Sequence, residues 1–277
     1  MGYKILRKET LAPGIKSFNI YAPLVSKKFK PGQFLVLRLH EKGERIPLTI
    51  VDTDPSNGSV KIVFQEVGKS TVELGRKDEN DEIMDILGPL GKESEIELYG
   101  EVLGIAGGVG AAPVYPILRK LKETGNRITT ILGGKSKETL IMEEELDKIS
   151  DKLIITTDDG SKGERGFVTM PLTRILEGGF SPRVVLAIGP LIMMKNVCAV
   201  TKSFGIKTIV SLNPIMLDGT GMCGCCRVSI EGKTKFTCVD GPEFDGHLVD
   251  FDELISRNNR FIEEEKISLA RDKNVKL

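Results

Sequence analysis

The order of hydrophobic and polar residues changes character once along the chain, near Gly100. Before that point short β-prone segments dominate, with turn signals such as Pro31-Gly32 and Asn57-Gly58 between them. The β-prone segments cover residues 14–21, 33–39, 47–51 and 59–64. Short strands at this spacing predict a small antiparallel β-barrel, which we expect to occupy residues 1–98.

Apolar runs alternate with helical stretches after Gly100. Helices are expected up to Lys122 and over 139–149, between apolar runs at residues 102–106, 127–132, 152–156 and 184–188. This alternation predicts a parallel sheet covered by helices, an α/β domain that we assign to residues 99–212. Residues 217–238 are rich in loop formers and residues 251–266 predict a charged helix. We therefore expect residues 213–277 to form a smaller third unit.

Charge and hydropathy exclude several classes of function. Lys plus Arg and Asp plus Glu each total 39, which leaves no net charge to attract nucleic acid or an anionic membrane. The longest apolar runs fall far short of the roughly 20 residues that cross a bilayer. Residues 1–10 lack the apolar core of a signal peptide. We expect a cytoplasmic enzyme that binds neither nucleic acid nor membranes.

The cysteines are distributed unevenly. Cys198 stands alone, whereas Cys223, Cys225, Cys226 and Cys238 fall within 16 residues. In a reducing cytoplasm such a cluster indicates a metal site rather than a disulfide framework. Cys198 is expected to be a buried structural residue on the helix after Gly189.

A glycine-rich turn follows the first apolar run of the α/β region. It reads Gly107-Gly108-Val109-Gly110-Ala111-Ala112-Pro113, and a helix is expected to begin inside it. Glycine lets the backbone approach a ligand closely, and free N–H groups at a helix start attract a pyrophosphate. The alternative is an ordinary strand-to-helix turn. The residues assigned to nicotinamide dinucleotide binding here are Gly107, Gly108, Gly110, Ala111 and Pro113.

Two later turns lie at equivalent places after strands. Asp158 and Asp159 follow one strand, and Gly189-Pro190-Leu191-Ile192-Met193 follows another. Ligands of open α/β sheets bind at the carboxyl ends of the strands, where all three turns are expected to meet. Taken alone, the aspartates indicate a solvated turn and Met193 a buried helix face.

The turn 107–113 together with Gly189-Pro190-x-x-Met193 resembles the ferredoxin–NADP reductase superfamily. The resemblance implies a flavin-binding barrel followed by a nicotinamide domain, with the first turn cradling the dinucleotide and the second near the nicotinamide. The barrel contains the matching flavin motif Arg45-Ile46-Pro47-Leu48-Thr49 and a second segment, Gly68-Lys69-Ser70-Thr71. An arginine pairs with the FAD pyrophosphate, and hydroxyls at a helix start suit phosphate oxygens. The implied FAD residues are Arg45, Pro47, Leu48, Thr49, Gly68, Lys69, Ser70 and Thr71.

The cysteine segment is close to the C-x4-C-x2-C spacing of plant-type ferredoxins, which hold a 2Fe–2S cluster. The sequence is Asp218-x4-Cys223-x2-Cys226-x11-Cys238, with aspartate at the first position. We favour these four residues as ligands; the alternative set replaces Asp218 by Cys225. A zinc site is the other possibility, although the spacing differs from paired C-x2-C knuckles.

Within the superfamily, this combination resembles the small-subunit family of electron-bifurcating transhydrogenases, which carries aspartate at the position of Asp218. The alternative is the electron-transfer subunit family of dihydroorotate dehydrogenase, which carries cysteine there. The resemblance implies hydride exchange between NAD(H) and FAD, and single-electron exchange with the 2Fe–2S cluster, without a catalytic acid or base. It also implies a heterodimer with a larger iron–sulfur flavoprotein subunit, through which NADP(H) and ferredoxin react. A zinc-stabilised binding module without redox activity is the alternative of another class.

Overall fold

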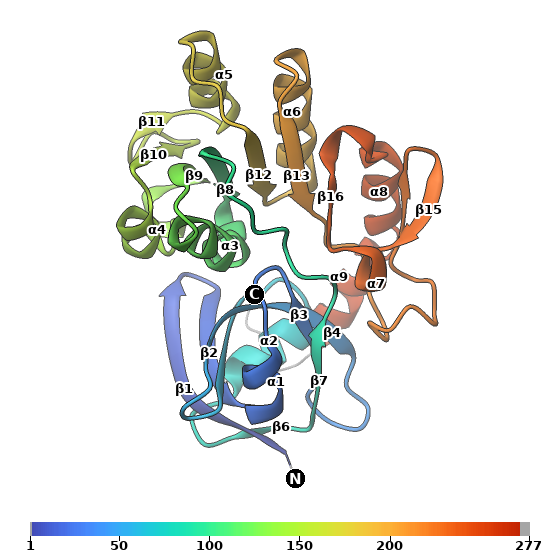
Figure 1. Ribbon diagram of the computed structural model, residues 1–277. Coiled ribbons are helices and arrows are strands. Elements are labelled where there is room, and N and C mark those ends of the chain that lie inside the picture. The colour runs from blue at the N-terminus through green and yellow to red at the C-terminus, as the bar shows by residue number, and fades with distance from the viewer. Residues whose placement is uncertain (1, 272–277) are drawn as a thin grey trace.

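A computed structural model describes residues 2–271 of the chain. The first sheet is antiparallel throughout, has the strand order β6-β1-β2-β5-β4-β3-β7, and curls into a near-barrel (Figure 1). Its strands are β1 (Tyr3–Ala12), β2 (Ile15–Tyr21), β3 (Phe34–Arg38), β4 (Arg45–Asp54), β5 (Ser59–Gln65), β6 (Glu82–Ile83) and β7 (Asp85–Leu90). Two helices belong to this part, α1 (Pro23–Lys28) and α2 (Lys69–Arg76). The antiparallel barrel is confirmed.

The second sheet has the order β11-β10-β9-β8-β12-β13-β16, and only β16 is antiparallel to its neighbour. Its strands are β8 (Glu101–Gly107), β9 (Arg127–Gly134), β10 (Lys152–Thr157), β11 (Glu164–Arg165), β12 (Val184–Ile188), β13 (Lys207–Ser211) and β16 (Glu243–Asp245). The helices are α3 (Ala111–Glu123), α4 (Glu143–Ile149), α5 (Thr169–Glu177) and α6 (Leu191–Ser203). The predicted α/β architecture is confirmed.

The helix expected over residues 139–149 is shorter than predicted. Ser136 and Thr139 close a 3-10 turn on themselves, and Met142 adopts a left-handed conformation with φ of 55°. That conformation interrupts a right-handed helix, so α4 begins only at Glu143.

The C-terminal part adds a hairpin and several short helices. It contains β14 (Arg227–Ile230), β15 (Lys233–Phe236), α7 (Thr237–Asp240), α8 (Phe251–Asn258) and α9 (Ile262–Arg271). The prediction of a single helix over residues 251–266 is therefore wrong, because the helix is interrupted between α8 and α9. The break falls after Asn258 and Asn259, which have weak helix propensity.

Two hydrophobic cores cover the two faces of the parallel sheet. On the face toward the barrel, α3 and α4 pack in a core that also includes Ala12, Ile15, Val51 and Val63 from the barrel strands (Figure 1). On the other face lie α5, α6 and α8. The barrel and the α/β domain thus share one core, which fixes their relative position. Cys198 is 5% exposed on α6, as expected for a structural residue.

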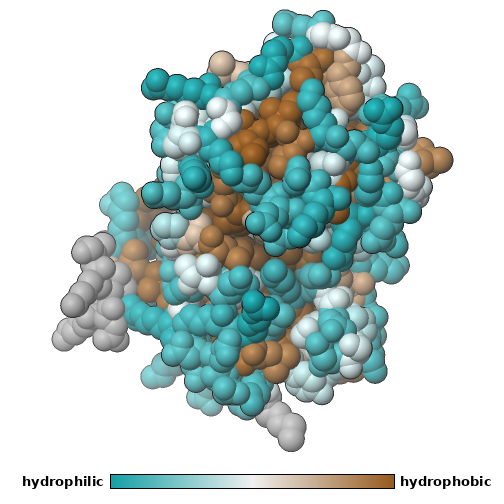
Figure 2. Space-filling model, turned by 90° about the vertical axis from the view of Figure 1, so that its left-hand side faces the viewer, coloured by the Kyte–Doolittle hydropathy of each residue, from teal (hydrophilic) through white to brown (hydrophobic). Residues whose placement is uncertain are grey.

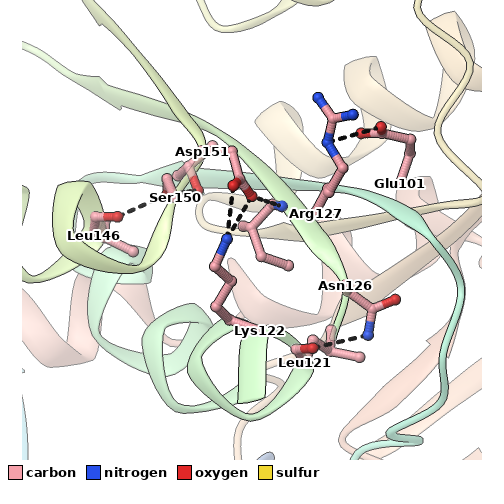
Figure 3. Close-up of polar contacts among 10 residues, drawn as sticks. Glu101, Leu121, Lys122, Asn126, Arg127, Leu146, Ser150 and Asp151 are labelled. Carbon is pink, nitrogen blue, oxygen red and sulfur yellow. Dashed lines mark hydrogen bonds and ion pairs between the residues drawn. The ribbon is translucent and has the colours of Figure 1, made fainter. Parts of the chain in front are cut away.

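Polar contacts hold the amino-terminal edge of the parallel sheet (Figure 3). Asp151 accepts from Lys122 Nζ at 2.7 Å and from the N–H of Ile128 at 2.7 Å. The Asn126 side chain donates to the carbonyl of Leu121 at 2.8 Å. It also accepts from the N–H groups of Tyr99 and Gly100 in the segment that enters β8. The edge opposite to the predicted cofactor turns is therefore tied down by side chains.

Among residues 2–271 no helix is long and apolar enough to span a bilayer. Hydrophobic residues nevertheless reach the surface in a hollow over the upper half of the molecule, where the α/β domain lies, with hydrophilic residues around it (Figure 2). Such a rimmed apolar area is typical of a ligand or protein contact.

Candidate functional site: two cofactor turns and a cysteine loop

The glycine-rich turn and the Gly-Pro turn meet at the carboxyl ends of β8 and β12. A Cβ on Gly110 would lie 2.2 Å from the carbonyl oxygen of Ile188, and one on Gly107 would lie 2.4 Å from Met193 Sδ. Only glycine permits this approach of the two turns. Gly108 has φ of 55°, and no atom lies within 4 Å of the position its Cβ would take. The turn is therefore packed on one side and open on the other, where a ligand could lie.

Asp158 and Asp159 follow β10 and are both exposed. Asp159 Oδ1 accepts from Ser161 Oγ at 2.6 Å and from its N–H at 2.9 Å, and these hydrogen bonds lower the pKa of the Asp159 carboxyl. Asp159 thus caps its own turn, the role expected of a solvated turn residue. The N–H of Asp158 donates to the carbonyl of Gly134 at 3.0 Å, which ties this turn to the end of β9.

The two predicted flavin segments lie side by side. Ser70 Oγ donates to the carboxylate of Glu44, the residue before Arg45 at the start of β4. Thr71 Oγ1 accepts from the N–H of Gly68 at 3.1 Å and thereby caps the start of α2. Arg45 and Lys69 are exposed there, free to face an anion. Glu44 was not anticipated, because its sequence position gives no sign of a partner on α2.

The remaining flavin motif residues lie on β4 beside β3. Pro47 pairs with Val36, Leu48 with Leu35, and Thr49 with Phe34. All three motif residues are half-buried, so this strand has a surface partly open to a planar ligand. The group of residues is suited to hold FAD, with the cation at one end and the strand surface at the other.

Two of the four cysteines in the loop are in contact. Cys226 and Cys238 are each 2% exposed, and their sulfurs lie 3.1 Å apart. They pack with Met216 and with Phe34 and Val36 of barrel strand β3. Burial, together with the neighbouring Cys226, raises the pKa of the Cys238 thiol to about 12. A metal supplies the positive charge that would offset this cost and favour the thiolate.

Asp218 and Cys223 lie on the same loop but are arranged differently. Asp218 Oδ1 accepts from the N–H of Thr220 at 2.8 Å, and Oδ2 accepts from the N–H of Cys223 at 2.9 Å. These N–H groups lower the pKa of the Asp218 carboxyl. Cys223 is exposed and Cys225 is half-buried. Within residues 2–271 no three His, Cys, Asp or Glu side chains are already arranged around a common metal position.

The chemistry of the loop nevertheless fits an iron–sulfur cluster. Four thiols lie on one short segment, and the buried hydroxyl of Thr237, next to Cys238, has no hydrogen-bond partner. Buried polar groups without a partner are rare and mark a place where a further group is expected. A Cβ on Gly219 would lie 2.8 Å from Leu90 of the barrel, so glycine lets the loop lie close against β7.

Comparisons with known proteins agree with this arrangement. Residues 213–250 match the iron–sulfur cluster binding domain of dihydroorotate dehydrogenase B, and residues 105–199 match the oxidoreductase NAD-binding domain. The first match identifies the cysteine loop as an iron–sulfur segment, which removes the basis for a zinc site.

Relatives extend over nearly the whole chain. It is 52% identical over 269 residues to the dihydroorotate dehydrogenase B (NAD(+)), electron transfer subunit homolog of Thermotoga maritima, covering 97% of this chain and 94% of that one. It is 36% identical over 243 residues to the probable dihydroorotate dehydrogenase B (NAD(+)), electron transfer subunit of Methanocaldococcus jannaschii, covering 87% of each.

Solved structures give the same picture. A chain of the NADH-dependent reduced ferredoxin–NADP oxidoreductase, solved to study flavin-based electron bifurcation, is 51% identical, with a TM-score of 0.92 and 98% of both chains covered. Phthalate dioxygenase reductase shares the fold at 17% identity, with a TM-score of 0.61 over 86% of this chain and 94% of its own. The chain therefore belongs to the ferredoxin–NADP reductase superfamily, in the family of dihydroorotate dehydrogenase B electron transfer subunits and their homologues, and is an oxidoreductase that uses NAD(H), FAD and a 2Fe–2S cluster.

Proposed function

We propose that the chain is the small subunit of an electron-bifurcating NADH-dependent reduced ferredoxin–NADP oxidoreductase. The observation that carries this proposal is the 51% identity to a chain of that enzyme over 98% of both chains. In this assignment the chain forms a heterodimer with a larger iron–sulfur flavoprotein subunit. NADP(H) and ferredoxin react at that larger subunit, in the cytoplasm.

Each predicted site has a role in positioning. The open side of the turn at Gly107, Gly108 and Gly110 accepts the dinucleotide pyrophosphate at the start of α3. Ala111 and Pro113 form the first turn of that helix, and Gly189, Pro190 and Met193 pack against the glycine turn that precedes it. Asp158 and Asp159 lie at the end of β10, and their charge favours NAD(H) over a 2′-phosphorylated dinucleotide.

The flavin residues hold the second cofactor. Arg45 and Lys69 are the exposed cations for its pyrophosphate, with Gly68, Ser70 and Thr71 at the start of α2 and Pro47, Leu48 and Thr49 along β4. FAD held by these residues would supply hydride exchange with a nicotinamide and single-electron exchange with the cluster. The residues of the chain orient these groups, and none is required as a general acid or base.

For the cluster we propose Asp218, Cys223, Cys226 and Cys238 as ligands. Cys226 and Cys238 are already in contact, and Asp218 and Cys223 are joined by the 2.9 Å hydrogen bond to the Cys223 N–H. The alternative fourth ligand is Cys225. It is adjacent to Cys226, and neighbouring residues cannot easily direct both side chains at one cluster.

The second candidate is the electron-transfer subunit of a dihydroorotate dehydrogenase. The names of the Thermotoga and Methanocaldococcus relatives and the family of residues 213–250 favour it. The two candidates differ in partner and in electron acceptor, while the flavin, nicotinamide and cluster sites would be the same.

Anaerobic affinity purification from the native host separates them. The first proposal expects a co-purifying subunit with 4Fe–4S clusters and FAD, and NADH oxidation that requires NADP and reduced ferredoxin together. A co-purifying FMN subunit that reduces NAD with dihydroorotate would support the second candidate. A colourless protein with zinc and no flavin would exclude both.

A further inference from the structure

Two arginines outside the proposed ligand set form hydrogen bonds with the backbone of the cysteine loop. Arg257 on α8 donates from Nη2 to the carbonyl oxygen of Cys225 at 3.2 Å, across 32 residues of sequence. Arg227, at the start of β14, donates from Nη1 to the carbonyl oxygen of Gly224 at 3.4 Å. Consecutive carbonyls of the loop are thus held by two guanidinium groups.

The fold fixes these arginines in place. On α8, Phe251 and Leu254 are buried in the same core as Val228 and Ile230 of β14. The helix and the strand that carry the arginines are therefore packed rigidly against each other. Arg257 is half-buried and Arg227 is exposed, so the contact of Arg257 is the better anchored of the two.

The arrangement gathers like charges. Burial, together with the positive charges of Arg227 and Arg260, lowers the pKa of the Arg257 guanidinium, and Glu253 is the acidic group that opposes this effect. Like charges that lie close together repel one another. The arginines beside the loop therefore lower the stability of the fold unless a negative group lies nearby.

We propose that Arg257, supported by Arg227, positions the cysteine loop and raises the reduction potential of the iron–sulfur cluster. Reduction adds one negative charge to the cluster, and a nearby fixed positive charge stabilises the reduced state. The hydrogen bond to the Cys225 carbonyl also holds that residue against α8, away from the ligand set. The inference rests on the proposed function only in requiring the cluster.

The test compares variants of the full-length, anaerobically purified protein by iron content, by the EPR spectrum of the dithionite-reduced state and by redox titration. Arg257→Gln removes both the positive charge and the guanidinium N–H donors. Arg257→Lys keeps the charge, and Arg227→Gln removes the second charge. Arg174→Gln is the matched control, because Arg174 pairs with Glu164 in the α/β domain.

We expect the midpoint potential to fall in Arg257→Gln and less in Arg227→Gln, with Arg257→Lys close to wild type and Arg174→Gln unchanged. If Arg257→Gln retains its full iron content and has the same midpoint reduction potential as the control Arg174→Gln, the proposal is overturned. Loss of iron in Arg257→Gln supports the positioning role. The midpoint potential of Arg227→Gln then tests the electrostatic role, because a fall supports it and an unchanged value overturns it. A wild-type protein without iron would instead overturn the proposed function.

Discussion

Arg119 on α3 forms a two-pronged ion pair with Asp52 on β4, with Nη2–Oδ1 at 2.8 Å and Nη1–Oδ2 at 3.2 Å. The Arg119 guanidinium also lies 5.3 Å from the ring centre of Tyr115. Since α3 begins at the proposed dinucleotide turn and β4 carries the proposed flavin motif, this pair joins the two elements that carry the proposed cofactor residues. It lies at the edge of the core that the barrel and the α/β domain share.

Breaking this pair should weaken the joint between the domains modestly. Both side chains are partly exposed, so solvent screens the attraction, and we expect Arg119→Gln to lower the free energy of unfolding by about 0.5–1 kcal/mol. A double-mutant cycle with Asp52→Asn, measured by urea unfolding, isolates the pair. A coupling energy of zero would show that the hydrophobic core alone joins the domains.

Stability should depend on pH through Glu243. Its carboxylate accepts from Ser94 Oγ at 2.5 Å, and burial raises its pKa above the ordinary value of 4.5. The folded state therefore binds the proton more tightly than the unfolded one. The resulting stabilisation is complete below the unfolded pKa and is lost as pH rises through the folded pKa.

Glu243→Gln removes this dependence, and its melting temperature should exceed that of wild type increasingly as the pH rises above the ordinary value of 4.5. Glu231→Gln, on an exposed residue, is the control. Parallel melting curves for wild type and Glu243→Gln across this range would contradict the assignment.

The dinucleotide turn should be intolerant of a side chain at Gly110. A methyl group there would collide with the carbonyl of Ile188, so Gly110→Ala must push the turn away from β12. We expect NADH to bind at least about 10-fold more weakly, because misplacement on the scale of an ångström costs up to about 100-fold. Stopped-flow flavin reduction measures this, with flavin content as the internal control. Unchanged NADH saturation would place the dinucleotide elsewhere.

The ligand assignment makes opposite predictions for two neighbouring positions. Asp218→Cys should keep the cluster and shift its potential, because thiolate donates differently from carboxylate. Cys225→Ser should leave the visible absorption and EPR spectra as they are. Loss of the cluster in Cys225→Ser, with no effect of Asp218→Cys, would assign the fourth ligand to Cys225.

Sequence reasoning succeeded where a local pattern determines local structure. Short β-prone segments with turns between them predicted the barrel, and apolar runs alternating with helices predicted the parallel sheet. The glycines that end β8 predicted the meeting of two turns. It failed at Met142, whose left-handed conformation delays the start of α4, and at Asn258 and Asn259, whose weak helix propensity accompanies the end of α8.

Long-range polar partners could not be predicted at all. Arg257 reaches Cys225, and Ser70 reaches Glu44, only because packing brings distant segments together. Nor does sequence spacing show that the Asp218 carboxylate accepts backbone N–H groups of its own loop. Those partners depend on the folded path of the chain, which spacing alone does not specify.

Cys226 and Cys238 pack against Phe34 and Val36, which belong to the barrel strand paired with the proposed flavin motif. The cysteine segment is therefore not a portable module that a linker merely attaches. Fused to another protein it would lack the side chains that cover its two buried cysteines, and a barrel grafted without it would leave Phe34 and Val36 exposed. An engineer who wishes to move this electron-transfer unit must move it whole.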